Sequence, residues 1–238
     1  MNSLIALPQG EALASTFERW WHTQGEWVEA PNQRRSGESG VQRIRTKAQQ
    51  LLYSKRQTGH LYRCWRHPLG RPTILRELQA MQALDKLGIR VPKLVYCAAQ
   101  KSAGQWRALL VTEALEGFVS LEQWYASSNA LRASAALNHH LLQQLAVMLS
   151  RLHLAGWQHG CLYPKHIFIK CHSARTGDWV ELALLDLEKS RQRLFGAAAS
   201  RHDLSQLYRH RGAMPESDWQ TFVATYSSFM RALAPYAP

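Results

Sequence analysis

The sequence predicts an α+β chain whose N-terminal part is rich in strands and whose C-terminal part is mainly helical. β-Prone pieces separated by turn residues fill the first third, and apolar residues at helical spacing dominate two later segments. No repeat or low-complexity tract interrupts this alternation. The 238 residues, of which 46% are hydrophobic, are enough to bury one substantial core or two modest lobes.

The first third is predicted to form a meander of hairpins. Its β-prone pieces are residues 26–30, 41–45, 51–55 and 61–65. The residues between them favour turns, in particular Pro31-Asn32, Ser36-Gly37, Gly40 and Thr58-Gly59.

A helix is predicted over residues 73–87, because apolar residues recur there at helical spacing and Gly88 provides a stop. Glu77 falls on the apolar face of this helix, between Ile74 and Met81. A buried carboxylate needs a cationic or hydrogen-bonding partner, so Glu77 calls for an explanation.

The middle of the chain predicts a boundary between two lobes. Strands are expected at residues 93–98 and 107–112, and the turn-like Glu116-Gly117 follows them. We therefore assign an N-terminal extension and a β-rich lobe to residues 1–115, and a helical lobe to residues 116–238.

The second lobe is predicted to begin with a long amphipathic helix and to continue with a hairpin. Leucines at helical spacing mark the helix over residues 137–152, and Gly156 ends it. Two strands are expected at residues 167–170 and 179–185, and the polar residues 171–178 between them favour a turn.

The charge balance favours anionic partners. With 29 Lys and Arg against 17 Asp and Glu, the formal net charge is +12, which suits phosphosugars, acidic lipid surfaces or nucleic acid. The basic residues are scattered and no nucleic-acid-binding motif occurs, so no nucleic acid partner is expected. The four cysteines form no C-x-x-C pair, which favours reduced thiols and a cytoplasmic protein. We expect neither a secretory signal nor a spanning helix, so membrane contact would be peripheral, with anionic lipid.

Two motifs carry a family resemblance. Residues 157–168, Trp-Gln-His-Gly-Cys-Leu-Tyr-Pro-Lys-His-Ile-Phe, resemble a catalytic loop, and residues 184–189, Leu-Leu-Asp-Leu-Glu-Lys, resemble a metal-binding segment. In this order they are similar to the protein-kinase-like fold, and specifically to the bacterial lipopolysaccharide kinase family (Kdo kinase and InaA type), from about residue 34 to residue 208. The resemblance implies two lobes with a truncated C-lobe, ATP and Mg²⁺ as cofactors, and phosphorylation of a sugar hydroxyl.

The resemblance assigns Lys55 to the nucleotide phosphates. An ion pair with Glu77 would hold the lysine extended and would satisfy the carboxylate of the helix. A solvated strand lysine and a glutamate at a helix edge would fit the same residue types.

Backbone groups are expected to make the other nucleotide contacts. The resemblance places Gly37 and Gly40 in a turn over the phosphates, although an ordinary hairpin turn fits these residues equally well. It places Glu113 and Leu115 in the hinge that bonds the adenine edge. Because backbone atoms would make that contact, the side-chain types at these two positions are weak evidence for a hinge.

The resemblance assigns the metal to Asp186, because a carboxylate is the ligand that Mg²⁺ prefers. A strand-end aspartate that caps a turn is the structural alternative. His166 occupies the position of a second metal ligand, yet imidazole is a poor ligand for Mg²⁺, so a single metal and a histidine that orients the loop also fit.

The catalytic-type loop departs from the kinase pattern at Cys161. The general pattern has the catalytic-base aspartate there, whereas a thiol is mostly neutral at pH 7 unless a cation such as His159 or Lys165 lowers its pKa. Lys165 would also bring charge to the transferred phosphate. His159 is expected to brace the loop, and Asp203 is expected to anchor it.

These features lead to two hypotheses. The first is an ATP-dependent kinase that phosphorylates a sugar of the lipopolysaccharide core, or another anionic glycolipid, at the inner face of the cytoplasmic membrane. The second is a nucleotide-binding pseudokinase with a regulatory role, which Cys161 supports. The sequence makes no prediction of the oligomeric state.

Overall fold

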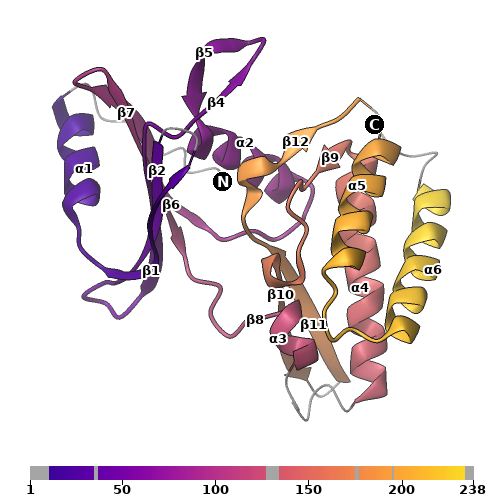
Figure 1. The fold of residues 1–238 in the computed structure, drawn as a ribbon. Helices are drawn as coiled ribbons and strands as arrows, with labels where there is room; N and C mark the ends of the chain where they lie inside the picture. The colour runs from indigo at the N-terminus through magenta and orange to yellow at the C-terminus, as the bar shows by residue number, and fades with distance from the viewer. Residues whose placement is uncertain (1–10, 35–36, 127–133, 175–176, 195, 234–238) are drawn as a thin grey trace. The chain divides into compact units, whose positions relative to one another are not determined.

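The structure is a computed structural model, and it describes residues 11–34, 37–126, 134–174, 177–194 and 196–233 (Figure 1). The chain forms two compact units. One contains residues 1–75 and 93–114, and the other contains residues 76–92 and 115–238. The division falls inside helix α2 (Thr73–Lys86). The predicted assignment of residues 1–115 and 116–238 to two domains stays a prediction.

The first unit contains a five-stranded antiparallel sheet in the order β1-β2-β3-β7-β6. Its strands are β1 (Glu26–Arg34), β2 (Gly37–Arg45), β3 (Leu51–Thr58), β7 (Gln105–Glu113) and β6 (Leu94–Ser102). The predicted strands at 26–30, 41–45, 51–55 and 107–112 all lie within these elements and are therefore confirmed.

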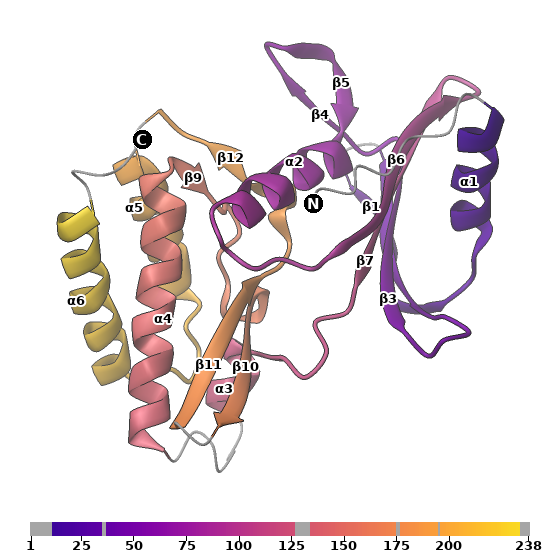
Figure 2. The ribbon, with the colours of Figure 1, turned by 180° about the vertical axis from the view of Figure 1, so that it is seen from behind.

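Helix α1 (Glu11–His22) lies along one face of this sheet, and the sequence-based predictions did not include it (Figure 2). Phe17, Trp20 and Trp21 share one side of the helix because they are three and four residues apart. Phe17 stacks on Trp21, and Trp20 stacks on Tyr96. The buried core beneath the helix consists of Phe17, Ile44, Leu52, Leu109 and Val111.

The turn predicted at Pro31-Asn32 is wrong, because both residues lie inside β1. This strand is at the edge of the sheet, where a proline is tolerated because its missing N–H can face away from the ladder. The pairing of β1 with β2 also shifts register between Glu29 and Asn32, which accommodates the proline.

A two-stranded sheet, β4 (Leu61–Cys64) and β5 (His67–Pro72), leads into α2. Helix α2 confirms the predicted helix and ends one residue earlier than expected. At the base of the hairpin, Thr73 Oγ1 lies 2.8 Å from His60 Nδ1 and donates to Gln57 Oε1 at 2.7 Å. All three side chains are buried, so this network fixes the point at which the hairpin leaves the sheet.

The second unit is organised around the predicted long helix, α4 (Ala135–Leu154). Ser134 caps its start by accepting the N–H of Leu137 at 3.3 Å. In both ribbon views α4 lies between α6 (Glu216–Leu233) and the hairpin of β10 and β11 (Figures 1 and 2). Leu141, Leu145 and Leu149 are fully buried on it.

The turn predicted over residues 171–178 is wrong for most of its length. Strands β10 (Ile167–Ala174) and β11 (Gly177–Leu184) continue through it, and residues 175–176 lie outside the described residues. Cross-strand pairing explains the extension, because His172 faces Trp179 and their rings stack with centroids 4.0 Å apart.

Several further elements complete the second unit. They are β8 (Val119–Ser120), α3 (Leu121–Ala126), β9 (Trp157–Gln158), the 3-10 helices η2 (Pro164–His166) and η3 (Leu187–Lys189), β12 (Arg191–Gln192) and α5 (Gly196–Arg209). Among the helices that the structure describes, none combines the length and the apolar character that crossing a bilayer requires.

Candidate active site

The loop between β9 and η2 contains the catalytic-type motif, and α5 holds its backbone. The buried carboxylate of Asp203 accepts the N–H of His159 at 2.6 Å and that of Gly160 at 3.0 Å. Gln206, one turn later on α5, accepts the N–H of Leu162 at 2.7 Å. The anchoring role predicted for Asp203 is therefore confirmed, and Gln206 is a second anchor that the sequence did not indicate.

Hydrogen bonds keep the Asp203 carboxylate ionised inside the fold. Burial alone would raise its pKa, but the hydrogen bond and the charge of His153 and the N–H of Gly160 lower the pKa below its usual value. His153 Nε2 lies 3.3 Å from Asp203 Oδ2, and its Nδ1 lies 2.8 Å from the hydroxyl of Tyr226. Both histidine nitrogens are thus used inside the core.

His159 braces the loop from within. Its Nε2 donates to the carbonyl of Leu185 at 3.0 Å, and its Nδ1 accepts the N–H of Cys161 at 3.2 Å. The ring is fully buried, and burial lowers the pKa of His159 to about 4. A neutral imidazole with both nitrogens bonded has no position left from which to accept a substrate proton.

Gly160 allows the loop to approach the segment that follows the second motif. Its φ of 80° lies in the left-handed region, and a Cβ there would lie 2.6 Å from the carbonyl oxygen of Lys189. Ser190 joins the same two segments by donating its hydroxyl to the carbonyl of His159 at 2.9 Å.

Cys161 is a buried thiol beside Lys189. Burial raises the pKa of Cys161, and the charges of Asp186 and Glu188 raise it further, whereas Lys189, which hydrogen-bonds the thiol and attracts its charged form, opposes this increase. The expectation that His159 or Lys165 lowers this pKa is wrong, because His159 is neutral and the effective cation is Lys189. The thiol is therefore protonated at neutral pH.

Asp186 and His166 face one another at the predicted metal position. Asp186 has a left-handed backbone, with φ of 59°, at the start of η3. His166 Nε2 lies 3.6 Å from Asp186 Oδ2, and His166 Nδ1 donates to the carbonyl of Cys161 at 2.8 Å. The hydrogen bond of Nδ1 orients the ring so that Nε2 points toward the Asp186 carboxylate.

This pair fits a metal that is shared with phosphate. Among the described residues no group of three or more His, Cys, Asp or Glu side chains could hold a metal ion. Mg²⁺ is commonly held by one or two carboxylates together with substrate phosphates and water, so a site with Asp186 alone is sufficient. Whether Asp186 and His166 bind metal stays a prediction.

The second unit also contains Glu77 and Lys165. Glu77 is 7% exposed on α2, and its neighbour Arg76 donates Nε to the carbonyl of Glu188 at 2.6 Å. This bond ties α2 to η3, two residues after Asp186. Lys165 is exposed on η2, which leaves its ammonium accessible, and its role in binding phosphate stays a prediction.

The first unit contains Lys55 in the middle of the sheet. The register places Val41 of β2, Lys55 of β3 and Leu110 of β7 side by side. Neighbours at the same register position point to the same face, so the lysine stem shares a face with two apolar residues. Lys55 and Glu77 belong to different units, and their ion pair stays a prediction.

Gly37 and Gly40 have a structural reason for lacking side chains. Both lie within β2 rather than in a turn, so the turn predicted at Gly40 is wrong. A Cβ on Gly37 would lie 2.4 Å from the backbone of Gly59 and His60, and one on Gly40 would lie 2.8 Å from the ring of Trp27. Their phosphate contacts stay predictions.

The predicted hinge lies where the chain passes from the first unit to the second, since Glu113 belongs to one and Leu115 to the other. The N–H of Glu113 donates to Lys93 at 2.9 Å, and that of Ala114 donates to Leu51 at 2.9 Å. These two donors are used within the protein, so adenine contacts would fall to other backbone groups of the segment.

Four residues of the site were missed or left without a role in the sequence analysis. They are Arg76, Lys189, Ser190 and Gln206. Lys189 was visible as the last residue of the second motif. The other three act through bonds to residues more than 30 positions away, and no local pattern signals such a contact.

Comparisons with known proteins identify the family and the fold. The sequence profile of the lipopolysaccharide kinase (Kdo/WaaP) family matches residues 18–226. Protein InaA of Escherichia coli (strain K12) is 42% identical over 210 residues, 88% of this chain and 94% of that protein. The EKC/KEOPS complex subunit bud32 of Emericella nidulans is 30% identical over 139 residues, 49% of each chain. A solved structure of WaaP in complex with acyl carrier protein has a TM-score of 0.67 at 22% identity and covers 92% of this chain and 85% of that one. The predicted protein-kinase-like α+β fold is confirmed.

Proposed function

Because the chain belongs to the lipopolysaccharide kinase (Kdo/WaaP) family, we propose that it transfers the γ-phosphoryl group of ATP to a hydroxyl of a sugar in the lipopolysaccharide core. Membership of a kinase family identifies the activity as phosphotransfer and implies ATP as the donor. The sugar acceptor, Mg²⁺ and the place of action at the inner face of the cytoplasmic membrane are parts of the proposal.

The observation that carries the proposal is the rigid loop beside Asp186. Its N–H groups from His159 to Leu162 are all bonded to Asp203, Gln206 or the His159 ring. Phosphoryl transfer has a loose transition state, so catalysis depends mainly on fixed positions and on neutralised charge. A loop braced in this way supplies the fixed positions.

Three groups would handle the phosphates. Asp186 would hold Mg²⁺, which when bound neutralises charge on the β- and γ-phosphates. Lys55 would contact the phosphates while paired with Glu77. Lys165, exposed on η2, would add positive charge near the transferred group.

The acceptor hydroxyl would attack the γ-phosphorus as the bond to the leaving ADP breaks. In a loose transition state the hydroxyl proton is lost late, and the phosphoryl oxygens or solvent can take it. A neutral Cys161 is compatible with this order of events. The thiol would line the acceptor position rather than remove the proton.

The test is incubation of the folded protein with labelled ATP, Mg²⁺ and extracted core glycolipid. We expect label in the glycolipid, and we expect Asp186→Ala to abolish it. Asp178→Ala is the matched control, because Asp178 is an exposed aspartate on β11 outside the site.

The same experiment decides between the two hypotheses. Family membership does not favour the pseudokinase, but the buried Cys161 thiol is the observation on its side. Nucleotide binding without transfer to the glycolipid or to water would contradict the kinase proposal. Release of phosphate without label in the glycolipid would retain the phosphotransferase and exclude this acceptor.

A further inference from the structure

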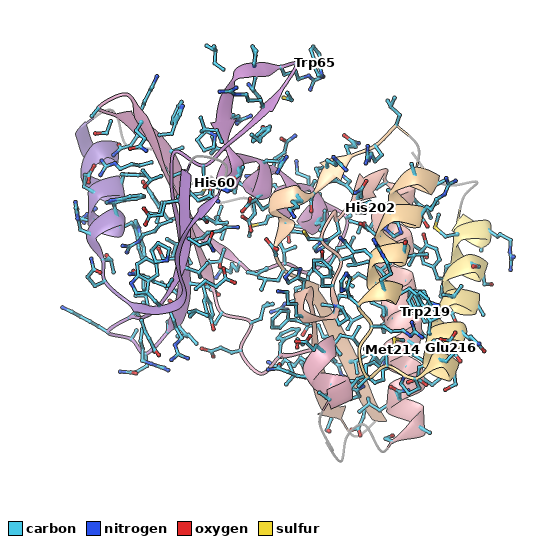
Figure 3. The ribbon with its side chains drawn as sticks, viewed as in Figure 1. His60, Trp65, His202, Met214, Glu216 and Trp219 are labelled. Carbon is cyan, nitrogen blue, oxygen red and sulfur yellow. The ribbon has the colours of Figure 1, made fainter. Side chains whose placement is uncertain are left out.

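The β4–β5 hairpin presents large apolar side chains to solvent. Trp65 is 84% exposed and Leu69 is 90% exposed. Figure 3 shows Trp65 at the tip of the hairpin and His60 at its base, where the chain leaves the sheet. Isolated exposed leucines are common, but an indole ring at a hairpin tip is a large apolar surface to leave in water.

Cations flank this apolar tip, and no acidic residue is close to them in the sequence. The hairpin contains Arg63, Arg66 and Arg71, and the sequence has no Asp or Glu from residue 61 to residue 76. Arg63 and Arg66 are exposed, and the guanidinium of Arg66 lies 4.7 Å from the centroid of the Trp65 ring. The tip therefore combines an aromatic ring with neighbouring positive charge.

The hairpin is held in shape below its tip. The rings of Tyr62 and His67 meet edge to face with centroids 6.2 Å apart, and Arg71 Nη1 lies 3.3 Å from His67 Nε2. Leu61 packs over Gly70, where a Cβ would lie 3.1 Å from the leucine side chain. Together with the buried network at its base, these contacts hold the part of the hairpin below Trp65.

We propose that the β4–β5 hairpin, residues 61–72, docks the protein on an anionic lipid bilayer. The indole ring would lie at the headgroup level with Leu69, while Arg63 and Arg66 would bind lipid phosphates. Charge complementarity favours an anionic bilayer as the binding partner, since a bilayer can accept an aromatic tip flanked by two arginines without a shape-matched pocket. This inference rests on the proposed function, because a kinase with a lipid-linked acceptor must work at a membrane.

Vesicle sedimentation tests the proposal directly and needs no nucleotide. The full-length protein is mixed with vesicles of phosphatidylcholine alone, or of equal parts phosphatidylcholine and phosphatidylglycerol. We expect binding to the anionic vesicles only, and we expect Arg63→Gln/Arg66→Gln to weaken it about 30-fold. This factor corresponds to the loss of about 1 kcal/mol of binding free energy for each arginine. Lys47→Gln/Lys101→Gln removes the same charge from exposed positions of the same unit and should weaken binding less than about threefold.

Trp65→Phe provides a second readout that does not depend on affinity. Brominated lipids should quench part of the tryptophan fluorescence of the wild-type protein, and that part should be lost in Trp65→Phe, which remains able to bind. Equal affinities of the arginine variant and the lysine control would overturn the proposal. So would a wild-type protein that stays in the supernatant with both vesicle types, as expected if the hairpin binds an acidic protein.

The vesicle assay and the transfer assay can fail separately. Vesicle binding through the hairpin without phosphotransfer would retain the docking surface and reject the kinase. Phosphotransfer to extracted glycolipid with no effect of the hairpin variants on vesicle binding would retain the kinase and reject the docking surface.

Discussion

Cys161 is where this chain differs most in chemistry from the general kinase pattern. Its thiol is buried and its pKa is raised, so it contributes no negative charge at neutral pH. Phosphoryl transfer tolerates this, because handling of the phosphates accounts for most of the rate enhancement and a positioned base adds about 10² to 10⁴.

Replacing the thiol tests this account. We expect Cys161→Asp to raise the rate of transfer by up to about 10² to 10⁴, because Lys189 beside the thiol can stabilise a carboxylate. Cys161→Ala should change the rate little. The measurement is labelled transfer by variants whose folding is verified by circular dichroism. A loss in Cys161→Ala as large as that in Asp186→Ala would show that the enzyme uses the thiol.

His159 should make the stability of the fold depend on pH. Its pKa is about 4 in the folded protein and about 6.5 in the unfolded chain, so below pH 6.5 the unfolded state binds a proton that the folded state does not. The free energy of unfolding should therefore fall as the pH drops from about 6.5 to about 4, by roughly 3 kcal/mol in total.

Denaturant unfolding between these two pH values measures this effect. His159→Gln should flatten the dependence, even if the variant is less stable at pH 7. His139→Gln, an exposed histidine of α4, is the control and should leave the dependence unchanged. Parallel curves for the wild type and His159→Gln would mean that other groups cause the acid sensitivity.

At the scale of elements, the site depends on the packing of α5 and η3 against one loop. Helix α5 bonds the loop N–H groups through Asp203 and Gln206, and Ser190 after η3 bonds a loop carbonyl. The carbonyl of Lys189 fills the space beside Gly160. A substitution at Gly160 should therefore disturb the loop and η3 together.

Substitutions at two glycines separate the stability cost of a packing clash from the cost of a left-handed backbone conformation. Gly160 and Gly104 have φ angles of 80° and 79°, but only Gly160 has backbone atoms within contact of an added Cβ. Gly104→Ala should cost about 1 kcal/mol for the left-handed conformation, and Gly160→Ala about 2 kcal/mol more for the clash. Thermal unfolding of both variants measures the difference. Equal losses would show that the loop moves freely away from η3.

At the scale of the whole molecule, the proposal assigns nucleotide binding to Lys55 and Glu77, which belong to different units. Lys55 lies on the sheet of the first unit, and Glu77 lies in the second on the helix that is bonded to η3. If ATP with Mg²⁺ binds as proposed, about 100 times its Kd should stabilise the protein by about 2.7 kcal/mol.

A double-mutant cycle tests the predicted pairing of Lys55 with Glu77. Lys55→Met and Glu77→Gln should each reduce the stabilisation by ATP, and the double variant should lose less than the sum, because one interaction is removed twice. The thermal shift with and without nucleotide corrects for the stability of each variant. Additivity within about 0.5 kcal/mol would show that the residues act independently.

The sequence by itself determined the elements that depend on short-range patterns. The helices α2 and α4 and most strands of the sheet follow from periodicity and from turn residues. The two motifs and their order were recognised through the family resemblance. The predictions from sequence failed where the position of a segment in a sheet overrides its local conformational preference. Pro31 is accommodated at a sheet edge, and residues 171–174 continue a strand because they pair with β11.

Only the tertiary structure decided how the motif residues are used. That Cys161 is neutral beside Lys189, that His159 has no free nitrogen, and that Gln206 anchors the loop all depend on residues distant in sequence. Burial changes the energy of each polar group, and burial is a property of the packed core rather than of a segment. For the same reason, the role of the aromatic face of α1 is apparent only from its packing against the sheet that it covers.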